Sequence, residues 1–302
     1  MAAFIFDDAA MNPCLPTSLA PPLIDPGCLQ ALLGAACGRF DVDALAACPS
    51  TSSLLLERAS HGAPAGSVVV ADRQTAGRGR RGRHWISSPE SSLTFSLLWR
   101  FEGGVERLAG LSLAVGVAVV RALENCGAAG ISLKWPNDIL FAEHGSYAKL
   151  GGILVESQIE RQVTQPIAQR SMLAVIGIGL NLQLPATGEF GKVPGETFVY
   201  PVASLSQALS PLPDRHVLLA QMLIELAAVL DRFTHGGFAV LRDEWLQRNA
   251  WQGRPVRLLR ETVLEKEGIC RGVDVDGALL IETDTGLGLE RCLSGDLSLR
   301  AG

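Results

Sequence analysis

The chain has 302 residues, of which 48% are hydrophobic, so it is long enough to form one large and one small domain around a real core. Its formal net charge of -5 at pH 7 argues against a general nucleic-acid binder, which would present a basic face. Its seven cysteines are scattered and never spaced as CxxC, which indicates reduced thiols and argues against a zinc site.

The N-terminal part of the chain carries few structural signals. Residues 1–24 are rich in Pro and Ala, and we expect them to be poorly ordered. The acidic start lacks the positive charge of a secretory signal, and no apolar run reaches the roughly 20 residues of a membrane span, so we expect a cytoplasmic protein with no membrane contact. Asp25-Pro26 predicts a helix start and Gly38 its end. Residues 1–48 are therefore expected to be an N-terminal extension, partly disordered, with a short helix.

Strands and helices alternate over the middle of the chain, residues 49–250, which we expect to form the catalytic domain. The predicted strands are 67–71, 92–98, 131–134, 139–141, 152–159 and 173–178. The predicted helices are 52–59, 106–126, 214–233 and 238–248. The helix over 106–126 is apolar nearly all round its middle, so we expect it to be buried against a sheet.

The sequence pattern changes over residues 251–302, where short alternating segments predict short strands. These strands are predicted at 255–259, 262–273, 278–282, 288–292 and 297–299, with turns at Asp276-Gly277 and Ser294-Gly295. The C-terminal part is therefore expected to be a small β-barrel.

An arginine loop, defined here as Gly77 to Trp85, is the strongest functional signal. Four arginines alternate with glycines over Gly77–Arg83, and their mutual repulsion and the glycines argue against a stable helix or strand without a partner. Guanidinium groups bind phosphate or carboxylate oxygens in paired hydrogen bonds. The expected partner is a small phosphorylated ligand. A disordered RNA-binding tail or a solvated loop are the alternatives, but a loop between two predicted core strands is not a tail.

Three further segments place polar groups at strand ends: Lys134–Asp138, Lys149–Glu156 and Gly177–Asn181. Asn137 and Asp138 present oxygens that suit Mg²⁺ bound to phosphates, although an Asx-capped turn has the same pattern. Lys149 begins a strand with two glycines, which permit close approach of a ligand, although a solvated strand edge is an equal alternative. No Walker A loop, dinucleotide fingerprint, GxSxG elbow or HExxH helix is present.

Together these segments resemble the biotin-protein ligases, enzymes that activate biotin with ATP and attach it to a lysine of a carrier domain. The resemblance extends from Cys48 to Arg300. Besides the segments above, its matching motifs are Ser50-Thr51-Ser52 and Gln74. It implies an α+β fold: a mixed sheet flanked by helices, of the class II synthetase-like biotin/lipoate ligase type, with a C-terminal SH3-like β-barrel. It implies ATP and biotin as substrates and Mg²⁺ as cofactor.

The resemblance also implies a role for each matching residue. Lys149 and Arg80 would be catalytic. The biotin site would consist of Ser50, Thr51, Ser52, Gln74, Arg78, Gly79, Arg80, Lys149 and Gly152. The nucleotide site would consist of Arg78, Arg81, Trp85, Lys134, Asn137, Asn181 and Arg300, with Asn137 and Asp138 at the magnesium ion.

Two positions depart from the family pattern: Ser52 stands where Asn is usual, and Ala148 where a basic residue often precedes the lysine. Only Arg39 and Arg58 are basic before Arg73, too few for a DNA-binding module, so we expect a monofunctional ligase without DNA binding. The expected partners are a biotin carboxyl carrier protein, such as that of acetyl-CoA carboxylase, and a possible second copy in a homodimer.

Other functions stay open at this point. A lipoate or octanoate ligase shares the architecture and the acyl-adenylate chemistry, but its arginine loop normally differs. An RNA-binding protein using Arg78–Arg83 would bind RNA with a steep salt dependence and no ATP chemistry. A degenerate ligase, suggested by Ser52, would bind biotin without transferring it.

Overall fold

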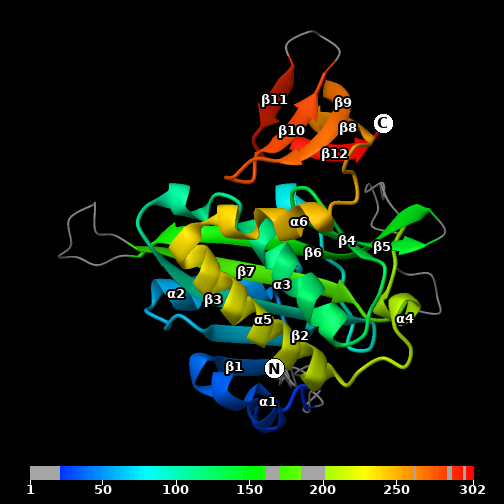
Figure 1. Cartoon of the computed structure of the whole chain (residues 1–302). Coiled ribbons are helices and arrows are strands. Elements are labelled where there is room, and N and C mark those ends of the chain that lie inside the picture. The colour runs from blue at the N-terminus through cyan, green and yellow to red at the C-terminus, as the bar shows by residue number, and fades with distance from the viewer. Residues whose placement is uncertain are drawn as a thin grey trace, which may run out of the picture.

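The larger part of the protein is built on a seven-stranded sheet with the order β1-β2-β3-β7-β6-β5-β4 (Figure 1). This computed structural model describes residues 21–143, 145–160, 171–184, 201–260, 263–283, 288–294 and 297–302. The strands are β1 (Asp41–Cys48), β2 (Ser67–Gln74), β3 (Ser92–Glu102), β4 (Ile131–Lys134), β5 (Asp138–Glu143), β6 (Ser146–Ile159) and β7 (Ser171–Asn181). Strands β1 and β2 are parallel and the pairs across the rest of the sheet are antiparallel, which confirms the expected mixed sheet.

Strand β1 differs from the sequence prediction. Residues 41–48 were assigned to the N-terminal extension, yet they pair with β2 in the register Val42 to Val68 and Cys48 to Gln74. The helix before them begins as predicted: α1 (Pro26–Leu33) is capped by Asp25, whose side chain accepts from the Gly27 N–H, and a 3₁₀ helix (Gly34–Arg39) follows. The expected disorder of residues 1–24 concerns mostly positions outside the described residues.

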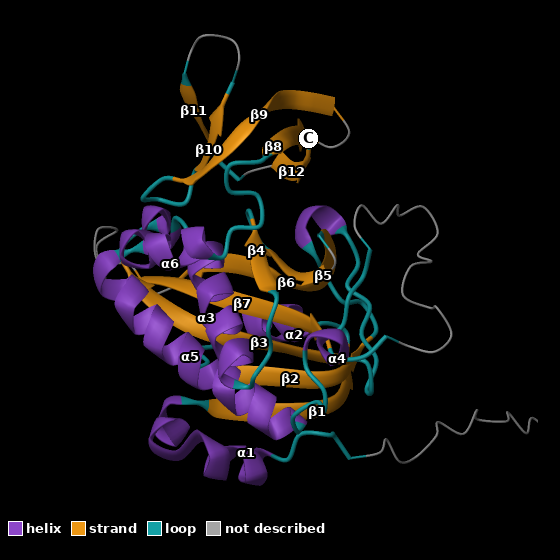
Figure 2. Cartoon of the chain, turned by 45° about the vertical axis from the view of Figure 1, so that its right-hand side comes forward, coloured by secondary structure: helices purple, strands orange, loops and turns teal. Residues whose placement is uncertain are grey.

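Helices cover one face of the sheet (Figures 1 and 2). They are α3 (Leu111–Asn125), which packs on β4, β5 and β6, and α5 (Arg215–Gly236), which packs on α3, β3 and α1. By length and composition alone Val105–Asn125 could cross a membrane, but 61% of its most apolar window is buried inside the protein. Its apolar residues therefore serve the core between sheet and α5.

The opposite face carries α2 (Thr51–Ser60), which packs on β2, β3 and β7 over a separate small core. That core consists of Leu55, Ala59, Val69, Leu98, Leu173 and Val175. Ser50 caps the helix and accepts from the Ser53 N–H at 3.4 Å. The N-terminus of α2 is thereby fixed over the middle of the sheet, beside the strands that carry the glycines of the expected site.

The C-terminal part forms a five-stranded antiparallel sheet with the order β11-β10-β9-β8-β12, consistent with the expected SH3-like domain. Its strands are β8 (Pro255–Arg260), β9 (Val263–Val273), β10 (Leu279–Glu282), β11 (Leu289–Cys292) and β12 (Leu297–Ala301). It lies beyond the β4 edge of the large sheet in both views (Figures 1 and 2). Trp135, fully buried, joins the two parts through its indole N–H, which donates to the Gly277 carbonyl at 3.0 Å.

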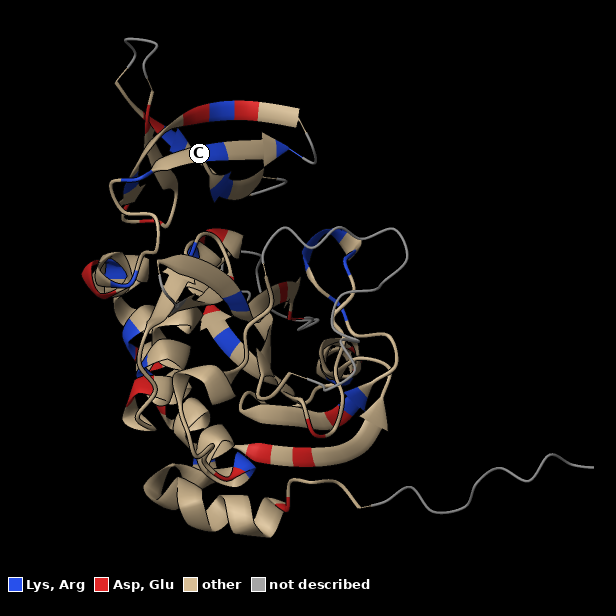
Figure 3. Ribbon diagram, turned by 90° about the vertical axis from the view of Figure 1, so that its right-hand side faces the viewer, with Lys and Arg blue, Asp and Glu red and all other residues tan. Residues whose placement is uncertain are grey.

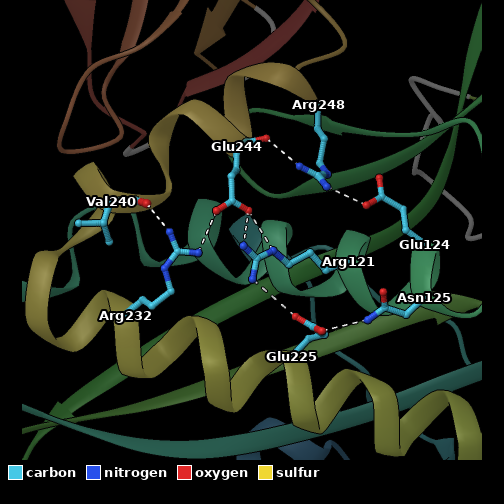
Figure 4. Close-up of polar contacts among 8 residues, drawn as sticks. All are labelled: Arg121, Glu124, Asn125, Glu225, Arg232, Val240, Glu244 and Arg248. Atoms are coloured by element: carbon cyan, nitrogen blue, oxygen red, sulfur yellow. Dashed lines mark hydrogen bonds and ion pairs between the residues drawn. The ribbon is translucent and has the colours of Figure 1, made fainter.

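A charge network fixes the helix that leads into the C-terminal sheet (Figure 4). This helix is α6 (Arg242–Gln247), preceded by a 3₁₀ turn (Phe238–Leu241); the short α4 (Leu205–Ala208) lies earlier in the chain. Glu244 of α6 accepts from Arg121 of α3 and from Arg232 of α5, and Arg248 pairs with Glu124. Three helices are thus tied together at the base of the C-terminal sheet.

Candidate active site

One cavity lies between the N-terminus of α2, the arginine loop, the strands β3, β6 and β7, and the C-terminal strand β12. Every residue that the sequence analysis placed in the biotin, nucleotide or metal sites lines this cavity. The two ends of the cavity differ in character: apart from Arg78, one is lined by neutral hydrogen-bonding groups, and the other is lined by lysines, arginines and one aspartate.

The neutral end is organised by a chain of hydrogen bonds. Gln74 Oε1 accepts from the Thr51 backbone N–H at 2.7 Å and lies 3.2 Å from the Thr51 hydroxyl. Ser96 Oγ lies 2.8 Å from Thr51 Oγ1 and 3.0 Å from Ser52 Oγ. Because Gln74 Oε1 can only accept, the Thr51 hydroxyl donates to it and accepts from Ser96, which in turn accepts from Ser52. The amide NH₂ of Gln74 is left to donate to a ligand.

Ser52 occupies the position where the family usually has Asn, and the structure gives it a specific neighbourhood. Its hydroxyl bonds to Ser96, which is fully buried. A Cβ on Gly177 would lie 2.5 Å from Ser52 Oγ, so glycine is required there while Ser52 keeps its position. Ser52, which stands in place of the usual Asn, therefore has a hydrogen-bond partner of its own in Ser96.

The charged end centres on Asp138, which lies between two lysines. Its Oδ2 pairs with Lys134 Nζ at 2.8 Å and its Oδ1 with Lys149 Nζ at 2.7 Å. Burial acts to raise the pKa of Asp138, but the two ammonium charges outweigh it and hold that pKa far below its ordinary value. Burial lowers the pKa of Lys134 to about 8, against the opposing effect of Asp138. Two cations on one carboxylate leave an excess positive charge, which favours an anionic ligand.

The expected magnesium site does not fit this geometry. Both carboxylate oxygens of Asp138 are paired with lysines, and Asn137 donates its amide to the Ile153 carbonyl at 2.9 Å while its oxygen accepts from Arg80 at 3.3 Å. Nowhere in the described part of the chain do three or more His, Cys, Asp or Glu residues group as metal ligands. Asp138 therefore acts on the lysines, not as a ligand to a cation.

The arginine loop forms a tight reversal over the cavity. The Trp85 N–H donates to the Gly77 carbonyl at 3.0 Å, and the Gly79 N–H to the Arg83 carbonyl at 2.7 Å. A Cβ on Gly77 would lie 2.2 Å from the Trp85 carbonyl oxygen, so this close approach requires glycine. As predicted, the loop contains no long helix or strand: it has one 3₁₀ turn over Arg80–Gly82 and an isolated bridge.

The arginines of this loop have different partners. Arg78 donates to Ser53 Oγ at 2.9 Å and pairs with Glu156, which places its guanidinium at the neutral end. Arg80 reaches Asn137 at the charged end and the Ser294 carbonyl of the C-terminal part at 3.2 Å. The nucleotide role expected for Arg78 stays a prediction. Figure 3 shows the basic residues of the loop beside those of the neighbouring strands.

Three further predicted residues have defined places. Trp85 lies flat on the sheet: a Cβ on Gly179 would be 2.3 Å from its Cε2, and its buried indole N–H has no hydrogen-bond partner within the described ranges. Asn181 donates its amide to the backbone carbonyls of Lys149 at 3.3 Å and Ala203 at 3.0 Å. Arg300 lines the cavity from β12. Trp85 thus lines the cavity, and its role toward the nucleotide stays a prediction.

Sequence reasoning missed Ser96 and Thr94, both on the cavity side of β3. The signal was present: Ser92, Thr94 and Ser96 alternate with apolar residues along a strand that is buried on both faces. Polar groups at a period of two on a buried strand mark a face that needs hydrogen-bond partners. The hydroxyl of Thr94 is buried and bonds to none of the described residues.

Comparison with known proteins agrees with the geometry of the site. The model of the Biotin/lipoate A/B protein ligase family matches residues 45–174, and that of the Biotin protein ligase C terminal domain matches residues 253–300. The bifunctional ligase/repressor BirA of Escherichia coli (strain K12) is 35% identical over 269 residues, 87% of this chain and 76% of that protein. The biotin–[acetyl-CoA-carboxylase] ligase of Paracoccus denitrificans is 35% identical over 248 residues, 80% of this chain and 94% of that protein.

Solved structures give the same result. The biotin protein ligase from Aquifex aeolicus in complex with biotin and ATP superposes with a TM-score of 0.67 and 29% identity, covering 87% of this chain and 99% of that chain. The relatives match this chain over most of their own length, and the matched regions include both parts of the fold. These observations agree on one family. The chain belongs to the biotin protein ligase family.

Proposed function

We propose that this chain is a biotin-protein ligase, which activates biotin with ATP to biotinyl-5'-AMP and pyrophosphate and then transfers biotin to a lysine of a carrier protein. The observation that carries the proposal is one cavity that has a neutral end and a cationic end. Biotin has an uncharged ureido ring at one end and a carboxylate at the other. A cavity of this polarity orients such a molecule with its carboxylate at the cations.

The neutral end suits the ring system. The Gln74 amide can donate to the ureido carbonyl, and the hydroxyls of Ser50 and Ser52 can accept from its N–H groups. The Ser53 N–H holds the Ser50 hydroxyl and the Thr51–Ser96–Ser52 chain holds that of Ser52 before the ligand arrives, so little side-chain entropy is lost on binding. Lipoate and octanoate carry no ureido group and would leave these polar groups without partners, which disfavours both acids.

The charged end suits the first chemical step. The biotin carboxylate oxygen attacks the α-phosphorus of ATP, the bond to the pyrophosphate oxygen breaks, and pyrophosphate leaves. Two anions must approach each other, so cations that stabilise the developing charge lower the barrier. We assign this role to Lys149 and Arg80, with Lys134 and Arg300 toward the nucleotide. Asp138 holds both lysine ammonium groups at the reacting position.

The second step needs no protein nucleophile. The amine of the carrier lysine attacks the biotinyl carbonyl carbon, and AMP leaves as the carbon–oxygen bond of the mixed anhydride breaks. Because the adenylate is hydrolysed by water, the arginine loop over the cavity protects it. Magnesium belongs to this proposal only as the counter-ion that ATP brings, and no step depends on a metal ligand from the chain.

The proposed acceptor is the biotin carboxyl carrier protein of acetyl-CoA carboxylase, the enzyme after which the Paracoccus denitrificans relative is named. The edge strand β1 offers backbone groups that can pair with a carrier domain or with a second copy in a homodimer, whereas Leu133 of the other edge strand, β4, already bonds to Arg248 and Ala250. The described cysteines are free thiols, which suits the reducing cytoplasm. The RNA-binding alternative gains no support, because Arg78 bonds to Ser53 and Arg80 to Asn137 within the protein.

The test is exchange of labelled pyrophosphate into ATP by the purified protein, run in parallel with biotin, lipoate and octanoate. Exchange with biotin alone supports the proposal, because it reports adenylate formation without any acceptor. Exchange with lipoate or octanoate would move the assignment to the sister enzymes. Binding of biotin without exchange would identify a degenerate ligase and overturn the proposal.

A further inference from the structure

Arg78 links two distant elements at the neutral end of the cavity. Its Nη1 donates to the hydroxyl of Ser53 in the first turn of α2 at 2.9 Å, and its Nη2 pairs with Oε1 of Glu156 on β6. The guanidinium therefore spans from the helix to the strand across one end of the sheet. It is the first arginine of the loop, so these two contacts fix the place where the loop leaves the protein body.

Glu156 has no part in the chemistry described above, and it does not line the cavity. Its side chain is 22% exposed, and its second oxygen, Oε2, is buried without a hydrogen bond to any described residue. A buried carboxylate oxygen without a partner is costly, and a neighbouring guanidinium offsets that cost. Among the described residues, Arg78 is the cation that the structure pairs with this carboxylate. Arg78 therefore offsets the cost of placing the Glu156 carboxylate at this half-buried position.

Two arginines hold the loop, and their contacts differ: those of Arg78 lie outside the cavity lining, and those of Arg80 lie at its charged end. At the far end Arg80 contacts Asn137 and the Ser294 carbonyl, beside the lysines where the anionic substrates are proposed to bind. Incoming anions compete for Arg80, so its contacts must change during a catalytic cycle. Ser53 and Glu156 lie outside the cavity lining, so the contacts of Arg78 can persist while substrates enter and products leave.

We propose that Glu156 is a positioning residue that holds Arg78 as the fixed end of the arginine loop, about which the Arg80 end opens and closes. This inference rests on the proposed function for its catalytic consequence, but the anchoring itself does not depend on which acid the enzyme uses. Loss of the anchor leaves Lys149, Gln74 and the hydroxyls of the neutral end in place and loosens the cover above them.

The test variant is Glu156→Gln, and the chain offers a matched control. Arg100 pairs with Glu160 just beyond the end of β6 at 2.6 Å, with side-chain exposures of 44% and 16% that resemble the 43% and 22% of Arg78 and Glu156. Glu160→Gln removes a comparable ion pair from the same end of the sheet without touching the loop. Any effect of Glu156→Gln that Glu160→Gln also shows is a general effect of losing an ion pair.

The first readout is limited digestion of the unliganded protein by trypsin at Arg80, Arg81 and Arg83. We expect Glu156→Gln to be cleaved there about five times faster than the parent and Glu160→Gln at the parental rate, on the usual scale for a partly exposed charged pair. Cleavage of Glu156→Gln at the parental rate overturns the inference. This readout needs neither biotin nor ATP, so it stands even if pyrophosphate exchange fails and the proposed function falls.

The second readout is kinetic. In biotin-dependent pyrophosphate exchange, Glu156→Gln should raise the KM for biotin about fivefold and keep kcat within about twofold, because a cover lost equally from bound substrate and transition state changes KM alone. The double variant Arg78→Gln/Glu156→Gln should be no worse than Arg78→Gln, since both changes remove one contact. Additive losses would overturn the anchor. If Glu156→Gln does not fold, Ser53→Ala and Arg78→Gln decide: parental cleavage rates in both overturn it.

Discussion

The two ends of the cavity solve different recognition problems with different chemistry. The neutral end consists of hydroxyls and an amide that are bonded in one direction, from Ser52 through Ser96 and Thr51 to Gln74. The charged end consists of Lys134, Asp138 and Lys149 within 2.8 Å contacts and carries excess positive charge. The comparison teaches how the proposed ligand would be oriented: the difference in polarity favours its ring at one end and its carboxylate at the other.

The comparison also separates affinity from rate. Neutral hydrogen bonds to the ring are present in the ground state and in the transition state alike, so their loss should raise KM. Charges at the other end act on the anion that develops during the reaction, so their loss should lower kcat. The following variants test that division, from the largest expected effect to the smallest.

The largest effect is expected for Asp138→Asn, which leaves the buried Lys134 without a counter-charge. Breaking a buried pair by removing one partner costs about 3 kcal/mol or more. Unfolding in urea should therefore show that loss in the free energy of unfolding. The double variant Lys134→Met/Asp138→Asn should recover most of the loss, because no charge is then buried. An Asp138→Asn protein as stable as the parent would contradict the pairing.

Lys149→Ala should reduce kcat for adenylate formation by about 100-fold, the usual scale for one electrostatic catalytic group. Its ammonium contacts Asp138 at 2.7 Å at the charged end of the cavity. Single-turnover formation of biotinyl-AMP measures the step directly. The KM for biotin should change much less than kcat if the lysine acts mainly in the transition state. Unchanged kcat would remove Lys149 from the catalytic group.

The pH dependence should report Lys134, whose pKa burial lowers to about 8. Below that pH the side chain is protonated and cationic, and above it the charge is lost, so the rate of adenylate formation should fall as pH rises through 8. The fall should approach about tenfold per pH unit for a single proton. Lys134→Arg stays charged because its pKa exceeds 12, so its profile should remain flat to higher pH. If the rate of Lys134→Arg also falls as pH rises through 8, the titrating group is not Lys134.

The smallest effect is expected for Ser96→Ala at the neutral end. Losing the hydroxyl that bridges Thr51 and Ser52 should raise the KM for biotin about fivefold with little change in kcat, since about one neutral hydrogen bond is lost. Thr94→Val is a control for stability on the same face of β3, because the Thr94 hydroxyl bonds to none of the described residues. Its free energy of unfolding should not fall, while that of Ser96→Ala should.

The sequence predicted most elements because their signals are local. Asp25-Pro26 starts α1, and the apolar stretch after Leu111 is the buried helix α3. Strand β1 was missed because Asp41–Cys48 carries acidic and small residues and only one β-branched residue. It is a strand because β2 lies beside it, and that information is not local.

The same distinction explains the site. The residues predicted for the site belong to recognisable motifs, and all of them line one cavity in the structure. Their contacts were harder to predict. Asp138 was expected to bind a cation because the sequence does not reveal that β5 pairs with β6, which brings Lys149 to the carboxylate. Ser96 was missed because its partners, Thr51 and Ser52, are more than forty positions away.

The most direct test of the oriented cavity is calorimetric binding of biotin and of biotinol, in which an alcohol replaces the carboxylate, to the parent and to Lys149→Ala. The account predicts that the parent binds biotin more tightly than biotinol and that Lys149→Ala reduces this preference, because the lysine and the carboxylate are partners. Equal loss of affinity for both ligands on removing Lys149 would show that the carboxylate does not lie at the charged end, and the account would be wrong.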